Sequence, residues 1–231
     1  MSVVPDPPMA QSSVERAYEY LRRMAIDFAM KPGERLNEGE FARVLKMSRA
    51  PVREAMNRLV SEDLLTVIPN QGFSCRRLSA SEVNALYEVR ADLEAAAVGR
   101  IPAEALAQGL RSLAKQHAAM RREARKASPE ALADRDEAFH LGLAGLSGNG
   151  ERLGLLRSIN ARVRFVRRVE LSDPVRLKRI LGDHGAVLDA LKAGDLEEAA
   201  RTLRRHLLLG PEEVADLVNQ ALTLIYAATV A

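Results

Sequence analysis

The feature that most constrains this chain is the stretch SRAPVREAMNRL, which begins at Ser48 and has the pattern of a short helix. Ser48 suits the N-cap, because a serine hydroxyl can accept a hydrogen bond from a first-turn N–H. Pro51 falls in the first turn, where its missing N–H costs little. Apolar residues recur with helical spacing and define one buried stripe: Val52, Ala55, Met56 and Leu59. The stretch therefore predicts a helix that is held against a core along one side.

The other side of this helix is basic. Between residues 43 and 58 the chain has one acid, Glu54, and five basic residues: Arg43, Lys46, Arg49, Arg53 and Arg58. Arginine can donate two parallel hydrogen bonds to phosphate oxygens or to O6 and N7 of guanine. The formal charge of the whole chain is only +3, so this local cluster is more informative than the total. The basic side predicts a helix that reads double-stranded DNA.

The residues around this helix predict a winged helix-turn-helix. An apolar stripe predicts a helix over residues 13–30, and Asn37 with Glu40 resembles a capping box that opens a second short helix. The pair 46–47 leaves only a tight connection before the basic helix. After it, the β-prone runs 65–68 and 73–76 flank the turn residues Pro69-Asn70-Gln71-Gly72, which predicts a hairpin.

The rest of the chain shows only helical periodicity, with breaks at glycine, proline and serine residues. Short connections favour antiparallel neighbours, so we expect a bundle of six or seven helices. The predicted segments are 80–99, 102–126, 129–147, 150–170, 174–193, 195–209 and 211–228. The fold class expected is mainly α, with an N-terminal winged helix-turn-helix and a C-terminal antiparallel all-α bundle. The expected domains are a disordered arm (1–12), a DNA-binding domain (13–77) and a helical domain (78–231).

Composition excludes several classes of protein. Apolar residues make up 47% of the chain but aromatic residues only 4%, and tryptophan is absent, so the cores must be built from aliphatic side chains. A single cysteine, Cys75, excludes an internal disulfide framework and suits a reducing cytoplasm. We find neither the pattern of a signal peptide nor an apolar run of about 18 residues, and therefore expect a cytoplasmic protein without a membrane span.

Polar side chains interrupt three apolar stripes of the second half. Asp136 and His140 lie one helical turn apart on one stripe, while His184 and His206 each occupy an inward position on another. Burying a lone carboxylate is costly, but burying it on a cation with imidazoles is not. These four residues predict a divalent metal site. Zinc or nickel suits the nitrogen-rich shell best, and manganese is also chemically compatible. The alternative is that each histidine is an ordinary hydrogen-bonded core residue.

Two further polar residues face inward. His117 falls on a stripe without a second ligand on its helix, which favours packing or a donor that lines the same cavity over a fifth metal ligand. Arg90 requires an anion, either Glu94 one turn on or the carboxylate of a bound effector. We expect Asp183, beside His184, to point outward. We expect the arginines of the fourth helical segment to form a solvated face: Arg157, Arg164 and Arg168.

Several motifs together resemble the GntR family of bacterial transcription regulators, in its FadR-like branch with a C-terminal FCD ligand-binding domain. Residues 48–55, SRAPVREA, are similar to the family's signature, and Gln71-Gly72-Phe73 is similar to its wing tip. Residues 90–94, RADLE, and 136–140, DEAFH, are similar to two motifs of the ligand domain. Residues 183–206 are similar to its last histidine-containing segment. The resemblance covers residues from about 13 to 209.

This resemblance implies a homodimer paired through the helical domains, a wing near the minor groove, and a divalent ion held by the positions matching Asp136, His140, His184 and His206. A small organic acid effector often lies beside that ion in such proteins, which makes Arg90 and His117 candidate effector contacts. The candidate DNA contacts are Arg43, Lys46, Ser48, Arg49, Pro51, Arg53, Arg58, Gln71 and Gly72. Two residues depart from the pattern: Gly39 replaces a frequent DNA-contacting arginine, and Lys46 replaces the usual glycine of the turn.

We therefore expect a DNA-binding regulator, by default a repressor, whose affinity for operator DNA changes when a small carboxylate binds beside a divalent metal. Two alternatives remain open. A metal sensor would respond to the ion itself. A metalloenzyme would use open positions on the ion for water and substrate, but no general base lies beside the expected ligands, because Glu137 faces away from them. The residues beyond about 210 predict one extra packing helix.

Overall fold

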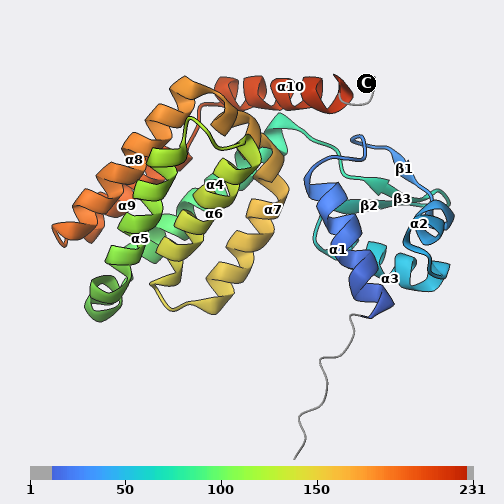
Figure 1. Ribbon diagram of the computed structural model, residues 1–231, viewed down its shortest axis with the longest axis horizontal. Coiled ribbons are helices and arrows are strands. Elements are labelled where there is room, and N and C mark those ends of the chain that lie inside the picture. Colours follow the sequence, from blue (N-terminus) through green and yellow to red (C-terminus); the bar gives the residue numbers. More distant parts are fainter. Residues whose placement is uncertain (1–11, 228–231) are drawn as a thin grey trace, which may run out of the picture. The chain divides into compact units, whose positions relative to one another are not determined.

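The computed structural model describes residues 12–227, so the arm expected over 1–12 lies outside the described residues except for Ser12. The chain divides into two compact units, with the boundary between Arg77 and Leu78 (Figure 1). Each unit has its own core. Among the described residues, no helix is both long and apolar enough to cross a membrane.

The N-terminal unit is a winged helix-turn-helix. From residue 12 onward it contains three helices, α1 (Ser13–Ile26), α2 (Glu38–Leu45) and α3 (Arg49–Ser61). Three short antiparallel strands form its sheet in the order β1-β3-β2: β1 (Arg35–Leu36), β2 (Leu65–Ile68) and β3 (Gly72–Cys75). The predicted hairpin is therefore confirmed, and β1 is an addition that sequence patterns did not indicate.

Three local features of this unit differ from expectation. α1 ends at Ile26 instead of residue 30, because the backbone at Phe28 is left-handed (φ 48°). Phe28 and Met30 are still buried, but they lie in the turn after α1 and not in the helix. Ser48 occupies the N-cap position of α3, but its hydroxyl makes no capping hydrogen bond. Lys46 has a φ of 53° and ends α2 in the left-handed region, where glycine is the usual residue.

The described part of the C-terminal unit, up to residue 227, consists of seven helices, close to the predicted segments. Their bounds are α4 (Ala80–Val98), α5 (Ala103–Glu123), α6 (Pro129–Gly145), α7 (Gly150–Ser172), α8 (Pro174–Lys192), α9 (Leu196–Leu207) and α10 (Pro211–Ala227). The starts follow from capping: for example, the Ser79 hydroxyl accepts a hydrogen bond from Glu82 N, and Asp173 caps α8.

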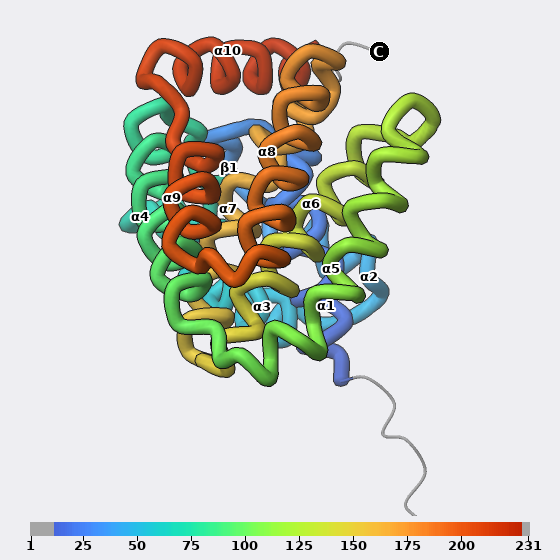
Figure 2. The backbone as a smooth tube through the Cα atoms, turned by 90° about the vertical axis from the view of Figure 1, so that its left-hand side faces the viewer, coloured from blue at the N-terminus to red at the C-terminus, as the bar shows by residue number. Residues whose placement is uncertain are grey.

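The helices of this unit pack as neighbours in a bundle. α9 lies between α4 and α8, α5 packs against α6 and α8, and α6 packs against α7 (Figure 2). α10 lies across one end of the bundle, where it packs on α4 and α7. A cluster of twelve buried side chains in this unit is almost wholly aliphatic, with Phe139 as its one aromatic member. Beside it, α6, α8 and α9 bring their buried polar side chains together.

Candidate functional site

The recognition helix α3 has the two faces that its sequence predicts. The apolar stripe is fully buried: Val52, Ala55, Met56 and Leu59. The arginines of the helix are exposed, and Pro51 is half-buried in the first turn. Burial of the stripe fixes the rotation of α3, so the basic side faces outward. The condition for a DNA-reading helix is therefore met.

Two shallow grooves meet beside the start of α3. The first, about 570 Å³, lies between α2 and α3 and is lined by Asn37, Gly39, Ala42, Arg43, Lys46, Met47, Ser48 and Arg49. The second, about 660 Å³, extends to the tip of the β2–β3 wing and includes Arg49, Arg53, Gln71 and Gly72 among its lining residues. Apart from Pro51 and Arg58, the structure thus gathers every candidate DNA contact around one continuous surface.

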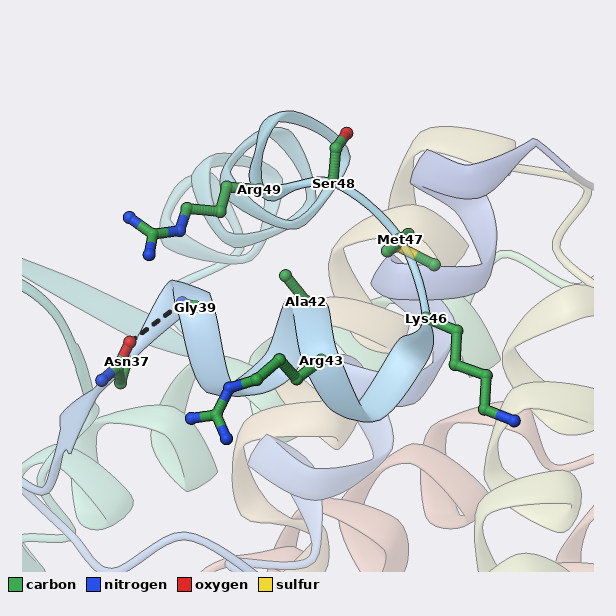
Figure 3. Close-up of a pocket in the computed structure, with 8 residues that line it drawn as sticks. All are labelled: Asn37, Gly39, Ala42, Arg43, Lys46, Met47, Ser48 and Arg49. Atoms are coloured by element: carbon green, nitrogen blue, oxygen red, sulfur yellow. Dashed lines mark hydrogen bonds between the residues drawn. The ribbon is translucent and has the colours of Figure 1, made fainter.

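The side chains at the first groove point in different directions. Arg43 and Arg49 both extend toward the end of α2 that begins after Asn37, whereas Lys46 points away from that end (Figure 3). The guanidinium of Arg49 lies over Gly39: a Cβ atom added there would stand 3.1 Å from one of its terminal nitrogens. The missing side chain at residue 39 therefore leaves the space that Arg49 occupies. Arg58 lies elsewhere, over the ring of Tyr18 and paired with Glu15 at 2.9 Å.

Arg53 is held by an acid from the neighbouring helix. Its Nε donates to a Glu38 carboxylate oxygen at 3.0 Å, and a terminal nitrogen donates to the other oxygen at 3.1 Å. The Arg53 side chain is nevertheless 66% exposed, against 17% for Glu38. Glu38 uses one forked edge of the guanidinium, and the geometry of arginine leaves a second edge for another acceptor.

The buried centre of the helical unit contains the four predicted metal ligands. His184 Nε2 lies 3.2 Å from His140 Nε2, and Asp136 Oδ1 lies 3.6 Å from the former and 3.7 Å from the latter. His206 joins these imidazoles, with nitrogen atoms of all three histidines within 4.8 Å of one another. α6 supplies Asp136 and His140, α8 supplies His184 and α9 supplies His206.

These atoms suit a divalent cation. Asp136 Oδ1 and His206 Nε2 are buried and have no hydrogen-bond partner among the described residues. Two imidazole nitrogens only 3.2 Å apart cannot both carry a proton toward each other, yet ligands at about 2.1 Å from a common ion adopt such separations. The donor set of three imidazoles and one carboxylate fits a nitrogen-rich divalent site.

Carboxylates behind the histidines orient them. His140 Nδ1 donates to Glu94 at 2.6 Å, which directs Nε2 of this ring toward the other donors. His206 Nδ1 donates in the same way to Asp183 at 3.1 Å. The expectation that Asp183 points outward holds only in part: its side chain remains 34% exposed, but α9 brings His206 against it. A carboxylate on the far nitrogen fixes the tautomer of a metal-binding histidine and raises its basicity.

The electrostatics of the cluster favour the protonation states that metal binding requires, with neutral imidazoles and ionised carboxylates. Burial, together with the neighbouring imidazoles, lowers the pKa of His184 well below its ordinary value, and burial also lowers the pKa of His206. Both rings are therefore neutral near pH 7. Burial opposes ionisation of Asp136, but Arg167 and the nearby imidazoles hold its pKa far below the usual range. Burial also opposes ionisation of Glu94, yet His140 and Arg90 lower its pKa to about 2.

The two candidate effector contacts have partners within the protein. Arg90 is 1% exposed, and its Nε donates to Glu94 at 2.7 Å, which is the first of the two alternatives that the sequence left open. His117 Nε2 donates to the carbonyl of Leu181 at 2.9 Å, and its ring centroid lies 6.2 Å from that of His184. His117 is therefore a neighbour of the cluster that is bonded to the backbone of α8.

Arg167 and Glu170 of α7 are the residues that sequence reasoning missed. Arg167 donates to Asp136 Oδ2 at 2.7 Å and to Glu170 at 2.5 Å, and all three side chains are buried. Their spacing contained a signal, because Asn160, Val163, Arg167 and Glu170 continue one helical stripe. In contrast, Arg164 and Arg168 are partly buried and pair with acids of α6, so only Arg157 matches the solvated face that was expected.

Comparison with known proteins now identifies the family. The sequence model of the bacterial regulatory proteins of the gntR family matches residues 13–74, and that of the FCD domain matches residues 85–209. The chain belongs to the GntR family. Within that family it is a FadR-like regulator, with an N-terminal helix-turn-helix and a C-terminal FCD domain.

Relatives of this GntR regulator include the Nta operon transcriptional regulator of Aminobacter aminovorans, which is 36% identical over 88% of this chain and 95% of that one. The HTH-type transcriptional repressor GlaR of Escherichia coli (strain K12) is 30% identical over 83% of this chain and 90% of its own. These relatives are regulators and not enzymes, which removes the metalloenzyme alternative.

Solved structures show the same fold. A protein from Rhodococcus sp. RHA1, described as a transcriptional regulator GntR, has a TM-score of 0.65 and 26% identity, over 90% of this chain and 99% of that one. E. coli McbR/YncC has a TM-score of 0.64 and 24% identity, over 95% of this chain and all of its own. The mainly α architecture, a winged helix-turn-helix followed by a helical FCD domain, is therefore shown by both sequence and structure.

Proposed function

We propose that this GntR regulator is a cytoplasmic homodimer that binds operator DNA through the surface beside α3. The continuous basic surface formed by the two grooves carries this proposal, because it places the start of the recognition helix beside the wing. A two-fold dimer binds a roughly palindromic site. Arg49 and Arg53 contact bases, Arg43, Lys46 and the free Ser48 hydroxyl contact phosphates, and Gln71 and Gly72 approach the minor groove. GlaR is named a repressor, which supports repression as the default sign of regulation.

The proposed signal is a small carboxylate bound beside a divalent metal in the FCD domain. Asp136, His140, His184 and His206 hold the ion, with zinc or nickel the best match and manganese compatible. Around these donors, two buried arginines, Arg90 and Arg167, face three buried carboxylates, Glu94, Asp136 and Glu170, which leaves one negative charge when the histidines are neutral. A divalent cation reverses that charge to one positive, and a monocarboxylate then neutralises it.

Buried charges are costly unless they are balanced, so this charge count favours an anionic effector over a neutral one. Arg90, which is bonded to Glu94 behind His140, and His117, whose ring centroid lies 6.2 Å from that of His184, are the proposed contacts of such an acid. The acid changes DNA affinity only if it binds one arrangement of the dimer better than another. If the ion alone changes DNA binding, the protein is a metal sensor, which is the second candidate function that the buried donor set supports.

Metal content tests the first part of this proposal. We expect native mass spectrometry and elemental analysis of the purified full-length protein to show a dimer with one ion per chain. The double substitution His184→Ala and His206→Ala should remove the ion and lower the melting temperature. The matched control is His117→Ala, because this neighbouring imidazole is bonded to a backbone carbonyl and should leave metal content unchanged. Stoichiometric metal in the double variant excludes this ligand set.

DNA binding tests the second part. Operator DNA can be selected from a random pool with the metal-loaded protein, and its affinity measured by fluorescence anisotropy at fixed salt. Adding small carboxylates to the metal-loaded protein should change this affinity, and adding them to the metal-free protein should not. A change caused by metal alone, without further response to any acid, favours the metal-sensor function instead.

A further inference from the structure

Helix α10 lies beyond the residues that match the FCD domain, which end at 209. Its apolar face is buried in the bundle: Val214, Leu217, Val218, Ala221 and Ile225. Its first turn carries two neighbouring acids, Glu212 and Glu213, and only Glu213 reaches back to the bundle. α10 therefore makes two kinds of contact, an apolar one with α4 and α7 and an ionic one with α8.

The ionic contact continues to the proposed metal centre. Arg179 of α8 donates to Glu213 at 2.7 Å and lies 3.7 Å from Oε1 of the buried Glu170. The other oxygen of Glu170 accepts from Arg167 at 2.5 Å, and Arg167 in turn donates to Asp136 Oδ2 at 2.7 Å. Arg176 adds a longer contact to Glu213, at 3.8 Å. Alternating charges thus connect the first turn of α10 with a proposed metal ligand.

This chain of ion pairs sets the orientation of the Asp136 carboxylate. Arg167 holds one carboxylate oxygen, Oδ2, so that the other, Oδ1, is left facing His140 and His184. Arg167 is itself fixed on its other side by Glu170, and Glu170 is 1% exposed. A buried ion pair contributes little net stability, since desolvation offsets the attraction, but it defines the geometry of its members strongly.

We propose that α10 is an outer support of the metal centre, and that Glu213 and Arg179 are positioning residues for Asp136. This inference rests on the proposed metal function. Glu213 sits in the first turn of α10, where a negative charge is favourable. Its carboxylate can meet Arg179 only when α10 is packed against the bundle. Coupling between two sites is reciprocal, so metal binding should also stabilise the docked position of α10.

The test compares Glu213→Gln with its matched control, Glu212→Gln. Both variants remove one acid from the first turn of α10, but only Glu213 belongs to the chain of ion pairs. Metal affinity of the full-length protein is measured by competition with a coloured chelator. Substitutions directly behind a ligand typically weaken metal binding 10–100-fold, and Glu213 lies further out, so we expect a loss of roughly 3–10-fold. Glu212→Gln should bind metal like the wild type, and Arg179→Met should resemble Glu213→Gln, whereas Lys178→Met should not.

Two further readouts separate positioning from a merely structural role. The visible absorption of the cobalt-substituted protein reports the ligand geometry, and it should shift in Glu213→Gln but not in Glu212→Gln. Hydrogen exchange of the α10 amides should slow when metal binds the wild type and change less in Glu213→Gln. Equal metal affinity and equal cobalt spectra for the two variants overturn this inference alone. A wild type that binds no metal overturns both the proposed function and this inference.

Discussion

The proposed DNA-binding surface beside α3 and the buried centre of the helical unit both contain arginine–carboxylate pairs, but the pairs differ in their exposure to solvent. Arg53 is paired with Glu38 but is 66% exposed, whereas Arg167 is 7% exposed and its partner Asp136 only 3%. An exposed pair contributes about 0–1 kcal/mol, so DNA can replace its acid at little cost. A buried pair is nearly fixed, because a partner that is removed leaves an uncompensated charge. One unit of this regulator therefore presents exchangeable contacts, and the other maintains a fixed geometry.

The largest expected effect comes from removing the buried guanidinium. Arg167→Met leaves Asp136 and Glu170 buried without their cation, and we expect the helical unit to lose about 3–5 kcal/mol of unfolding free energy. Chemical denaturation of the metal-free protein measures this loss. The matched control is Arg164→Met, one turn earlier on the same helix. Its partners are the exposed Asp134 and the partly exposed Glu137 of α6, and a change of about 0–1 kcal/mol is expected. Equal losses in both variants would remove the contrast between the two regions.

Acid should destabilise the buried centre before it affects the recognition surface. The pKa values of His184 and His206 are lowered in the folded, metal-free protein, while in the unfolded chain they return to about 6.5. Below that pH the unfolded state binds more protons than the folded state, so stability falls as the pH decreases. Each histidine then costs up to about 1.4 kcal/mol per pH unit. Denaturant titrations at several pH values measure the slope, and the double variant His184→Ala, His206→Ala should lose it.

Replacing the exposed arginine should affect DNA binding but not stability. Arg53→Ala removes a proposed base contact, and we expect a loss of about 1–3 kcal/mol in discrimination between operator and random DNA, measured by anisotropy at fixed salt. Its unfolding free energy should change by about 0.5 kcal/mol or less. Unchanged discrimination in both Arg53→Ala and Arg49→Ala would falsify the assignment of this surface to base recognition.

Glu38 provides a sharper version of the same experiment. Its carboxylate occupies one edge of the Arg53 guanidinium, and the Arg53 side chain is 66% exposed. Glu38→Gln removes the negative charge but retains an acceptor. We expect the variant to bind random DNA more tightly, because one repulsive charge beside the phosphates is lost, and to discriminate the operator less well. A variant with unchanged affinity for both DNAs contradicts a role for Glu38 at this surface.

The helices and the buried polar positions that the sequence predicts correctly are those set by local chemistry. Capping serines, prolines and glycines mark where helices begin and end, and a histidine or aspartate inside an apolar stripe must face the core, as His140 and Asp136 do. The features that were missed depend on partners distant in sequence. β1 has only two residues and exists because Arg35 and Leu36 pair with β3. Asp183 turns to His206 only after α8 and α9 are packed together.

The smallest predicted effect lies in the turn between α2 and α3. Lys46 adopts a φ of 53°, which costs an ordinary residue about 1 kcal/mol, whereas glycine adopts it freely. Lys46→Gly should therefore stabilise the N-terminal unit by somewhat less than about 1 kcal/mol, because glycine also gains freedom in the unfolded chain. The same change removes a cation from the groove, so affinity should fall equally for all DNA sequences. The slope of log affinity against log salt concentration should decrease by about one, the value for one phosphate contact.

Lys46→Asn separates the two effects: asparagine tolerates this φ but carries no charge. If this variant keeps the full salt dependence of the wild type, Lys46 does not contact phosphate.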